Sequence, residues 1–136
     1  MAGLEHGRDL GEAILALAAA NDISCAWVNA IGAVSCARIS AYRQAERRYL
    51  ELELKEPLEL VSCLGNISLR DKKPFLHAHV VLGREDGSLS GGHLCPGTPV
   101  FAGECCLFEL AGGVPERIFD SVTGLGLWPR RKPGGE

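Results

Sequence analysis

"FLHAHVVLGREDGSLSGGHL", residues 75–94, contains two segments of strand-like composition with a turn between them. Residues 75–83 are apolar on both faces, which predicts a central strand that is covered on both sides. Residues 84–88, "REDGS", have the composition of a turn. Residues 89–94 then form a second predicted strand, at a distance that allows the chain to return beside the first.

The chain on either side of this stretch is also predicted to be mostly sheet. Runs rich in Val, Ile, Leu and Cys predict further strands at 23–31, 34–42, 48–54, 58–69 and 100–110. The run "RYLELEL" at 48–54 alternates between polar and apolar residues, so one of its faces is expected to meet water. Gly32 is expected to lie in the turn between the first two of these strands.

One helix is predicted, over residues 9–20 in "RDLGEAILALAAAND". Its apolar residues recur at helical spacing and form a single buried stripe, made of Leu10, Ala13, Ile14, Leu17 and Ala18. Asp9 is the expected N-cap, with Glu12 three residues later as in a capping box, and Asn21 is the expected stop.

These elements predict an α+β fold, in which the N-terminal amphipathic helix packs on a largely antiparallel sheet of about six or seven strands. With 136 residues the chain suits one compact domain. We place that domain at residues 1–128 and interpret 129–136 as a disordered tail.

Charge and hydropathy limit the classes of function. The net charge of −3 has the wrong sign for a domain that gains affinity by neutralising phosphates. Two basic clusters, Arg43/Arg47/Arg48 and residues 130–132, are interpreted as a solvated turn and a frayed terminus. No apolar run reaches the ~18 residues of a membrane span, and the first residues lack the features of a signal peptide. We therefore expect a cytoplasmic protein with no membrane partner, whose six cysteines are reduced.

Three of the four histidines, His77, His79 and His93, fall within the opening stretch. Side chains alternate along a strand, so His77 and His79 point to the same face, a little under ~7 Å apart at Cα. Three imidazoles without a neighbouring cysteine suit zinc or another divalent ion, with one coordination position left open. The alternative is that these histidines are ordinary sheet residues that hydrogen-bond to their neighbours. Spacing alone leaves both interpretations open.

Carboxylates could assist such a site by orienting an imidazole or by acting as a general base. Glu104 stands alone in the apolar run "VFAGECCLF", where an unpaired charge would be costly to bury, and it is the candidate catalytic residue. Glu59 is a weaker candidate. For both, the alternative is a solvent-facing position on an edge strand.

Five motifs in order give the chain a family resemblance. They are GRDLGEAI (7–14), AWVNAIGAVSCARISAY (26–42), PLELVSCLGNISL (57–69), KPFLHAHVVLGREDGSLSGGHLCPGTP (73–99) and RIFDSVTGLGL (117–127). Together they resemble the PPC domain, the "plants and prokaryotes conserved" domain also called DUF296, in its stand-alone prokaryotic form. The resemblance covers roughly residues 4–128.

The resemblance implies a compact α+β domain that assembles as a homotrimer. Prokaryotic members carry H-x-H followed by G-G-H, which match His77, His79 and His93, and in those members the three positions look like a metal site, zinc being the expected ion. Plant members place the domain behind AT-hooks in nuclear DNA-binding proteins. This chain has no AT-hook, because "RRKPGGE" lacks the Arg-Gly-Arg-Pro core.

Three hypotheses of function follow. The preferred one is a homotrimeric metal-binding protein that holds a divalent ion, expected to be zinc, and binds or transforms a small molecule near Glu104. If it is an enzyme, metal-assisted hydrolysis or a lyase step would suit the residues; the sequence leaves open whether it is one. The alternatives are a DNA-associated regulatory protein, which the acidic charge disfavours, and a trimeric protein-interaction scaffold without catalysis.

Overall fold

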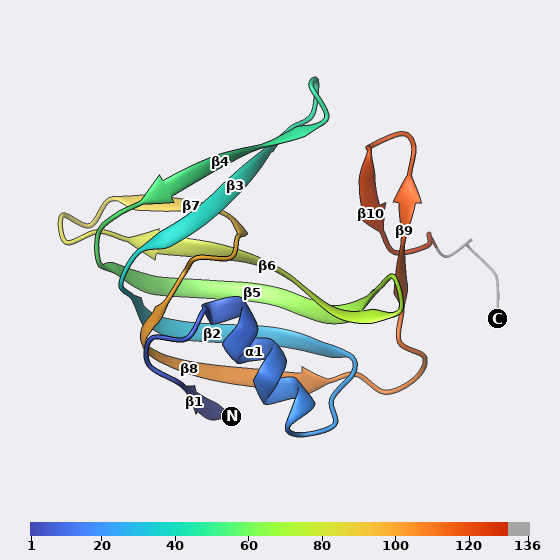
Figure 1. Cartoon of the computed structure of the whole chain (residues 1–136), viewed down its shortest axis with the longest axis horizontal. Coiled ribbons are helices and arrows are strands. Elements are labelled where there is room, and N and C mark those ends of the chain that lie inside the picture. Colours follow the sequence, from blue (N-terminus) through green and yellow to red (C-terminus); the bar gives the residue numbers. More distant parts are fainter. Residues whose placement is uncertain (131–136) are drawn as a thin grey trace.

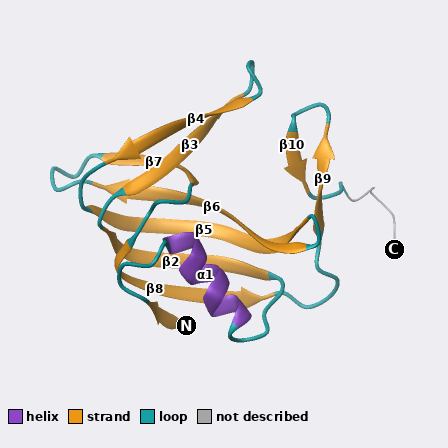
Figure 2. Ribbon diagram, in the orientation of Figure 1, coloured by secondary structure: helices purple, strands orange, loops and turns teal. Residues whose placement is uncertain are grey.

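The computed structural model describes residues 1–130, which form ten strands and one helix (Figure 1). In chain order the elements are β1 (Ala2–Leu4), α1 (Leu10–Ala19), β2 (Ala26–Val34), β3 (Ala37–Arg43), β4 (Arg48–Leu54), β5 (Leu58–Arg70), β6 (Lys73–Gly83), β7 (Leu89–Leu94), β8 (Val100–Glu109), β9 (Glu116–Asp120) and β10 (Leu125–Leu127). Figure 2 shows the single helix lying across one face of the sheet.

The main sheet has the order β1-β8-β2-β5-β6-β7-β3-β4, and each neighbouring pair in this order is antiparallel. β6 lies between β5 and β7, so the prediction that residues 75–83 form a central strand is confirmed. The prediction that this strand is covered on both sides was wrong, because His79 and Val81 are exposed on one face. β9 pairs in parallel with the end of β5 and is joined to β10. The pair β9–β10 rises beside the β3–β4 hairpin in Figure 1.

The predicted fold class was wrong in its strand count, because the described chain has ten strands rather than six or seven and is mostly antiparallel sheet with one short helix. All seven predicted strands are present, and the three that were missed are β1, β9 and β10. Each of these is only three to five residues long. A segment this short cannot display a clear alternation, and it becomes a strand because a partner is available.

The helix begins at the predicted N-cap, Asp9, and ends at Ala19, one residue before its predicted end. Asp9 caps it, because Oδ1 accepts hydrogen bonds from the backbone N–H groups of Gly11 and Glu12 at 3.0 and 3.2 Å. The other oxygen, Oδ2, accepts from the backbone N–H groups of Gly97 and Thr98 at 2.8 and 3.0 Å. Asp9 therefore ties the start of α1 to the loop that follows β7.

One face of the sheet forms the hydrophobic core under α1. From the helix, Leu10, Ile14 and Ala18 are buried, and Leu17 is half-buried against the same core. From the sheet, buried residues alternate along β2, β5 and β6, with one register shift in β5 after Leu60; they include Ala26, Val28, Ala30, Leu60, Cys63, Ile67, Ala78, Val80 and Leu82. The alternation fixes which side chains remain on the opposite face.

The opposite face, which we call the open face, is rich in apolar side chains, and within residues 1–130 no helix covers it. Its exposed large residues include Trp27, Ile31, Leu64, Val81 and Phe108. The polar face of β4 meets water, as its alternation predicted, but Leu50 and Leu52 on the other face are also 44% and 50% exposed. They are exposed because β4 is the last strand of the sheet and nothing in the described chain packs on its apolar side.

Two glycines reveal where strands come unusually close. A Cβ on Gly92 would lie 2.6 Å from the backbone oxygen of Ser40, so β7 can approach β3 only without a side chain there. Gly32 was expected to form a turn but lies inside β2 with φ of 144°, where a Cβ would meet the backbone oxygen of Ala102 at 2.2 Å. The turn lies instead at Ser35–Cys36.

No helix within residues 1–130 is long and apolar enough to cross a membrane. The six cysteines all fall in this part of the chain and none forms a disulfide. The predicted tail, 129–136, lies outside the described residues from position 131 onward.

Candidate metal centre

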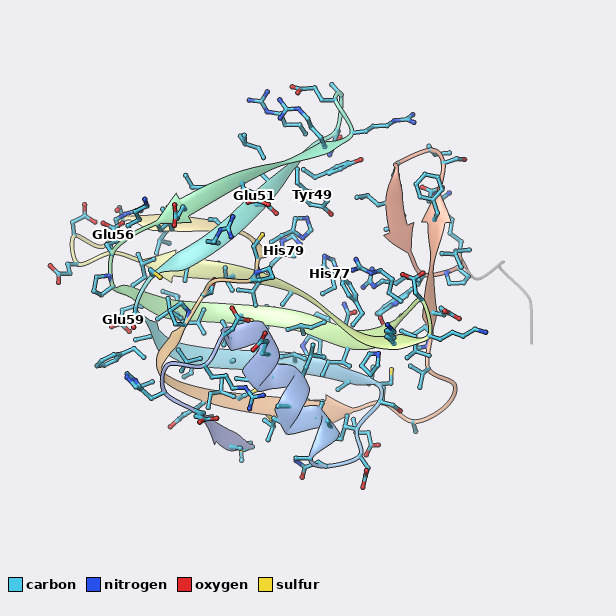
Figure 3. All side chains as sticks on the ribbon, viewed as in Figure 1. Tyr49, Glu51, Glu56, Glu59, His77 and His79 are labelled. Atoms are coloured by element: carbon cyan, nitrogen blue, oxygen red, sulfur yellow. The ribbon has the colours of Figure 1, made fainter. Side chains whose placement is uncertain are left out.

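The pairing of β6 with β7 brings the three histidines together on the open face. His79 and His93 are directly opposite each other in the register, and His77 precedes His79 by two residues on the same face. The ring centroids of His79 and His93 are 4.1 Å apart, and that of His77 is 5.3 and 5.2 Å from them. Figure 3 shows His77 and His79 between β6 and the β3–β4 hairpin that carries Tyr49 and Glu51.

The spacing of the imidazole nitrogens fits one metal ion. One nitrogen from each ring can be chosen so that all three lie within 4.8 Å of one another, and His77 Nε2 is 3.2 Å from His93 Nδ1. Two nitrogens bound to one tetrahedral zinc at about 2.0–2.1 Å would be about 3.4 Å apart. Three neutral imidazoles are a donor set that zinc and neighbouring divalent ions accept. The residues present therefore suit such an ion.

The surroundings hold two of these imidazoles in the neutral form that binds metals. Burial, then the Arg117 cation, then the other two histidines lower the pKa of His77 from 6.5 to about 4. Burial and the neighbouring His79 also lower the pKa of His93. A proton therefore competes poorly for His77 and His93 near neutral pH.

Two adjoining cavities open beside the histidines. The larger, of about 490 Å³, and the smaller, of about 130 Å³, share the lining residues Tyr49, Arg70, Phe75, His77 and His93. Tyr49 packs edge-on against His93, with ring centroids 5.1 Å apart. The Cζ atom of Arg70 lies 3.9 Å from the centre of the Phe75 ring. A small molecule in this space would contact apolar surface, a phenol and an arginine.

Arg117, from β9, reaches the far side of His77. Its Nη2 donates to Asn66 Oδ1 at 2.9 Å and lies 3.3 Å from His77 Nδ1. Its Nη1 donates to the backbone oxygen of Gly126 at 3.1 Å. The turn between β9 and β10 is held by Asp120, whose Oδ2 accepts from the backbone N–H and the hydroxyl of Thr123 at 3.1 and 2.6 Å.

The structure does not bring the predicted catalytic carboxylate to the histidines. Glu104 is exposed on β8, paired in register with Ile31, and β2 and β5 lie between β8 and β6. At about 4.8 Å for each strand, Glu104 lies on the order of 14 Å from β6. Glu104 has apolar neighbours in the sequence because the open face, like the core, is rich in apolar side chains. The charge of Glu104 is not buried. Glu59 is also exposed, and Figure 3 shows it at the opposite end of the sheet from His77.

Three residues of the site were missed by the sequence analysis: Tyr49, Arg70 and Arg117. Tyr49 was assigned only to an alternating strand, although it follows the turn whose basic residues were noted. Arg117 begins the motif RIFDSVTGLGL, so its presence in the resemblance was the available signal. Nothing in the spacing along the chain places any of them beside His77.

The fold and the site together define a small, mostly antiparallel β protein with a three-histidine candidate metal centre. Residues 1–111 match the family model of the Plants and Prokaryotes Conserved (PCC) domain. The chain belongs to this family, as its motifs predicted. No curated protein matches the chain.

Solved structures agree with this assignment. A metal-containing protein from Archaeoglobus fulgidus is 44% identical, with 95% of this chain and 91% of that chain covered and a TM-score of 0.89. A plant- and prokaryote-conserved protein from Pyrococcus horikoshii is 37% identical, with 96% and 90% covered and a TM-score of 0.89. A candidate DNA-binding protein from Bacteroides thetaiotaomicron is 24% identical, with 93% and 88% covered and a TM-score of 0.84, and shares the fold.

The lowered pKa of His77 predicts how the stability of the metal-free protein changes with pH. Because the folded pKa of about 4 lies below the unfolded value of 6.5, the unfolded state takes up a proton at His77 first as the pH falls. The contribution of His77 to the free energy of unfolding is therefore complete above about pH 6.5 and is lost as the pH falls towards 4. Denaturant unfolding of chelator-treated protein should show a steeper loss of stability over this range in wild type than in His77→Gln. If the free energy of unfolding fell equally steeply with pH in both proteins, the lowered pKa of His77 would be contradicted.

Proposed function

We propose that His77, His79 and His93 hold one divalent metal ion, zinc, in a site with an open coordination position. The observation that carries this proposal is the convergence of the three imidazole nitrogens within 4.8 Å of one another. The A. fulgidus protein, described as metal-containing and 44% identical to this chain, adds support. When bound, a three-histidine zinc ion acts as a Lewis acid towards an oxygen of whatever occupies its open position.

The ion would serve to bind or transform a small molecule. The cavity of about 490 Å³ beside His77 and His93 is in the size range of small-molecule sites, and its lining is mostly apolar with a few polar groups. Tyr49, half-exposed above His93, is placed to donate a hydrogen bond to a ligand. Its pKa is raised by burial and by the neighbouring Tyr42, so the phenol keeps its proton.

The protein would act as a homotrimer. The open face exposes Trp27, Ile31, Leu64 and Phe108 by 44–54% each, which is unusual for a sheet that remains in contact with water. Burying such a face between identical copies is the simplest way to remove it from water. His79 stands on the same face, opposite Leu64, so each metal centre would lie beside a contact between subunits.

The charges of the chain favour this function over nucleic-acid binding. The net charge is −3, and in the basic cluster at the β3–β4 turn both Arg43 and Arg48 pair with Glu46. Arg47 of the same cluster donates to the backbone oxygen of Ser121. The free thiols of all six cysteines suit the cytoplasm, where we place the protein.

Replacing His79 by Ala should abolish metal retention while leaving the fold intact, because His79 is exposed and supports no core packing. The measurement is zinc per chain by elemental mass spectrometry, after purification without added metal and after reconstitution. We expect about one ion per chain in wild type and a large loss in the variant. His6→Ala, which removes an exposed histidine outside the site, is the matched control and should keep the ion. An unchanged metal content in His79→Ala would rule out the site.

Replacing Ile31 by Glu should dissociate the trimer, because it places a charge at the centre of the open face, beside Glu104. Light scattering during size-exclusion chromatography gives the mass directly, and we expect three chains for wild type and one for the variant. Ala19→Glu adds the same charge to the outer side of α1 and should leave the trimer intact. A wild-type monomer, or a variant that stays trimeric, would contradict this interface.

A further inference from the structure

The guanidinium of Arg117 makes an unusual contact with a proposed metal ligand. Arg117 Nη2 lies 3.3 Å from His77 Nδ1, while the other ring nitrogen, Nε2, lies 3.2 Å from His93 Nδ1. An arginine side chain has only donors, so His77 Nδ1 must be the acceptor in this contact. In a neutral ring the proton then sits on Nε2, which donates to His93.

This arrangement is incompatible with a metal ion on His77 Nε2. A ligating nitrogen needs a free lone pair, and the ring proton must then move to Nδ1, where metal-bound histidines normally meet an acceptor. In this chain the group that faces Nδ1 is the donor Arg117. Binding of a metal ion at His77 must therefore break the hydrogen bond from Arg117.

Breaking that bond leaves three of the five N–H groups of Arg117 without a partner among the described residues. One is the Nη2–H released from His77. The others are the second Nη1–H and the buried Nε–H, which already has no hydrogen-bond partner. Asn66 and Gly126 still hold the remaining donors of the guanidinium in place. A fixed arginine with unpaired N–H groups is a ready receptor for an anion.

The neighbouring charges also favour an anion. The cavity of about 130 Å³ is lined by Arg70 and Arg117 together with His77 and His93, and no acidic residue within positions 1–130 lines it. Three carboxylates line the larger cavity: Glu51 is paired with Arg38 at 2.8 Å, both oxygens of Asp9 accept from backbone N–H groups, and Glu12 is an exposed residue of α1. The anion subsite is therefore assigned to the smaller cavity. A divalent ion on three neutral histidines would add further positive charge.

We propose that Arg117 and Arg70 form an anion subsite beside the metal centre, which becomes available when His77 binds a metal ion and which takes the carboxylate of a small organic ligand. The planar carboxylate matches the fork of a guanidinium. The body of the ligand would lie against Phe75 and Tyr49, which line both cavities. This inference rests on the proposed metal site and adds the chemical class of its ligand.

The proposal requires that metal and carboxylate bind with positive cooperativity. The metal ion frees Arg117 for the carboxylate, and the carboxylate holds Arg117 away from His77, so each must raise the affinity for the other by the same factor. One hydrogen bond to a charged group sets the scale of this factor at about ten-fold or more.

The test uses Co²⁺, whose visible absorption reports binding, and benzoate as the probe carboxylate. The Co²⁺ affinity of the wild-type protein is measured without benzoate and with saturating benzoate, and it should rise by about ten-fold or more. No change in Co²⁺ affinity would overturn the proposal. Phenylphosphonate is the second probe, and a larger effect of this compound would overturn the carboxylate assignment in favour of a phosphoryl group.

Variants separate this role from a structural one. Arg117→Met should bind Co²⁺ more tightly than wild type in the absence of benzoate, because the competing hydrogen bond to His77 is gone, and it should lose the benzoate effect. If Arg117 had only a structural role, Arg117→Met would instead bind Co²⁺ more weakly than wild type. Arg70→Met should reduce the benzoate effect, because it removes the second cation of the anion subsite. Arg8→Met, which removes an exposed arginine paired with Glu5, is the control and should match wild type in both.

A measurement on the unaltered chain guards against a variant that fails to fold. Nitrogen NMR of the histidine rings should place the His77 proton on Nε2 in the metal-free protein and on Nδ1 after Zn²⁺ is added. A metal-free protein with the proton already on Nδ1 would overturn the proposal. If no metal binds at all, the proposed function fails; if metal binds but benzoate has no effect on its affinity, only this inference fails.

Discussion

The antiparallel register between β6 and β7 is the constraint on which the site depends. It places His79 opposite His93, and the two-residue period of β6 then puts His77 beside them. The same register buries Ala78, Val80 and Leu82 under α1. A slip of one residue would expel these three side chains from the core and turn His77 and His79 towards the helix. The hydrophobic core therefore fixes the geometry of the candidate metal centre.

Close approach of the strands supports this register on both sides. Gly92 lets β7 lie against the backbone of Ser40 in β3, and Gly65 lets β5 lie against the backbone of His77, where a Cβ would be 2.4 Å from its oxygen. The loop after β7 is also held in place, because Asp9, the N-cap of α1, accepts hydrogen bonds from the backbone N–H groups of Gly97 and Thr98. The imidazoles thus stand on a rigid surface, as a preorganised metal site requires.

The region around the histidines is built from segments that are far apart in the sequence. Tyr42, in β3, donates to the backbone oxygen of Thr123 at 2.7 Å, so the β3–β4 hairpin and the β9–β10 pair meet beside the cavities. Tyr49 comes from the first of these and Arg117 from the second. Both approach the site through tertiary contacts, and the cation of Arg117 contributes to the low pKa of His77. The chemistry of the site therefore depends on these two protruding pairs as much as on the central strands.

Features that depend on neighbouring residues in the chain could be predicted from the sequence, and features that depend on contacts between distant segments could not. The helix, its Asp9 cap, the seven longer strands and the central place of β6 depend on periodicity and turn composition, and these were predicted. The three short strands form only because a partner offers them hydrogen bonds: β1 pairs with β8, β9 pairs with β5, and β10 pairs with β9. No local pattern in the sequence reveals these partners. The three histidines could be predicted because two share a strand and the third follows one turn. Glu104 was chosen for its apolar neighbours, but these alternate between the core (Val100, Cys105) and the open face (Phe108), and Glu104 itself is exposed.

X-ray absorption spectroscopy of the zinc-loaded protein is the most direct test of the metal centre. The account predicts a first shell of nitrogen and oxygen atoms only, at about 2.0–2.1 Å, with the multiple-scattering pattern of about three imidazoles. The six cysteines offer the competing ligands, and Cys95 is the one nearest to His93 along the chain. A sulfur atom in the first shell at about 2.3 Å, or a shell without imidazole scattering, would contradict the three-histidine site.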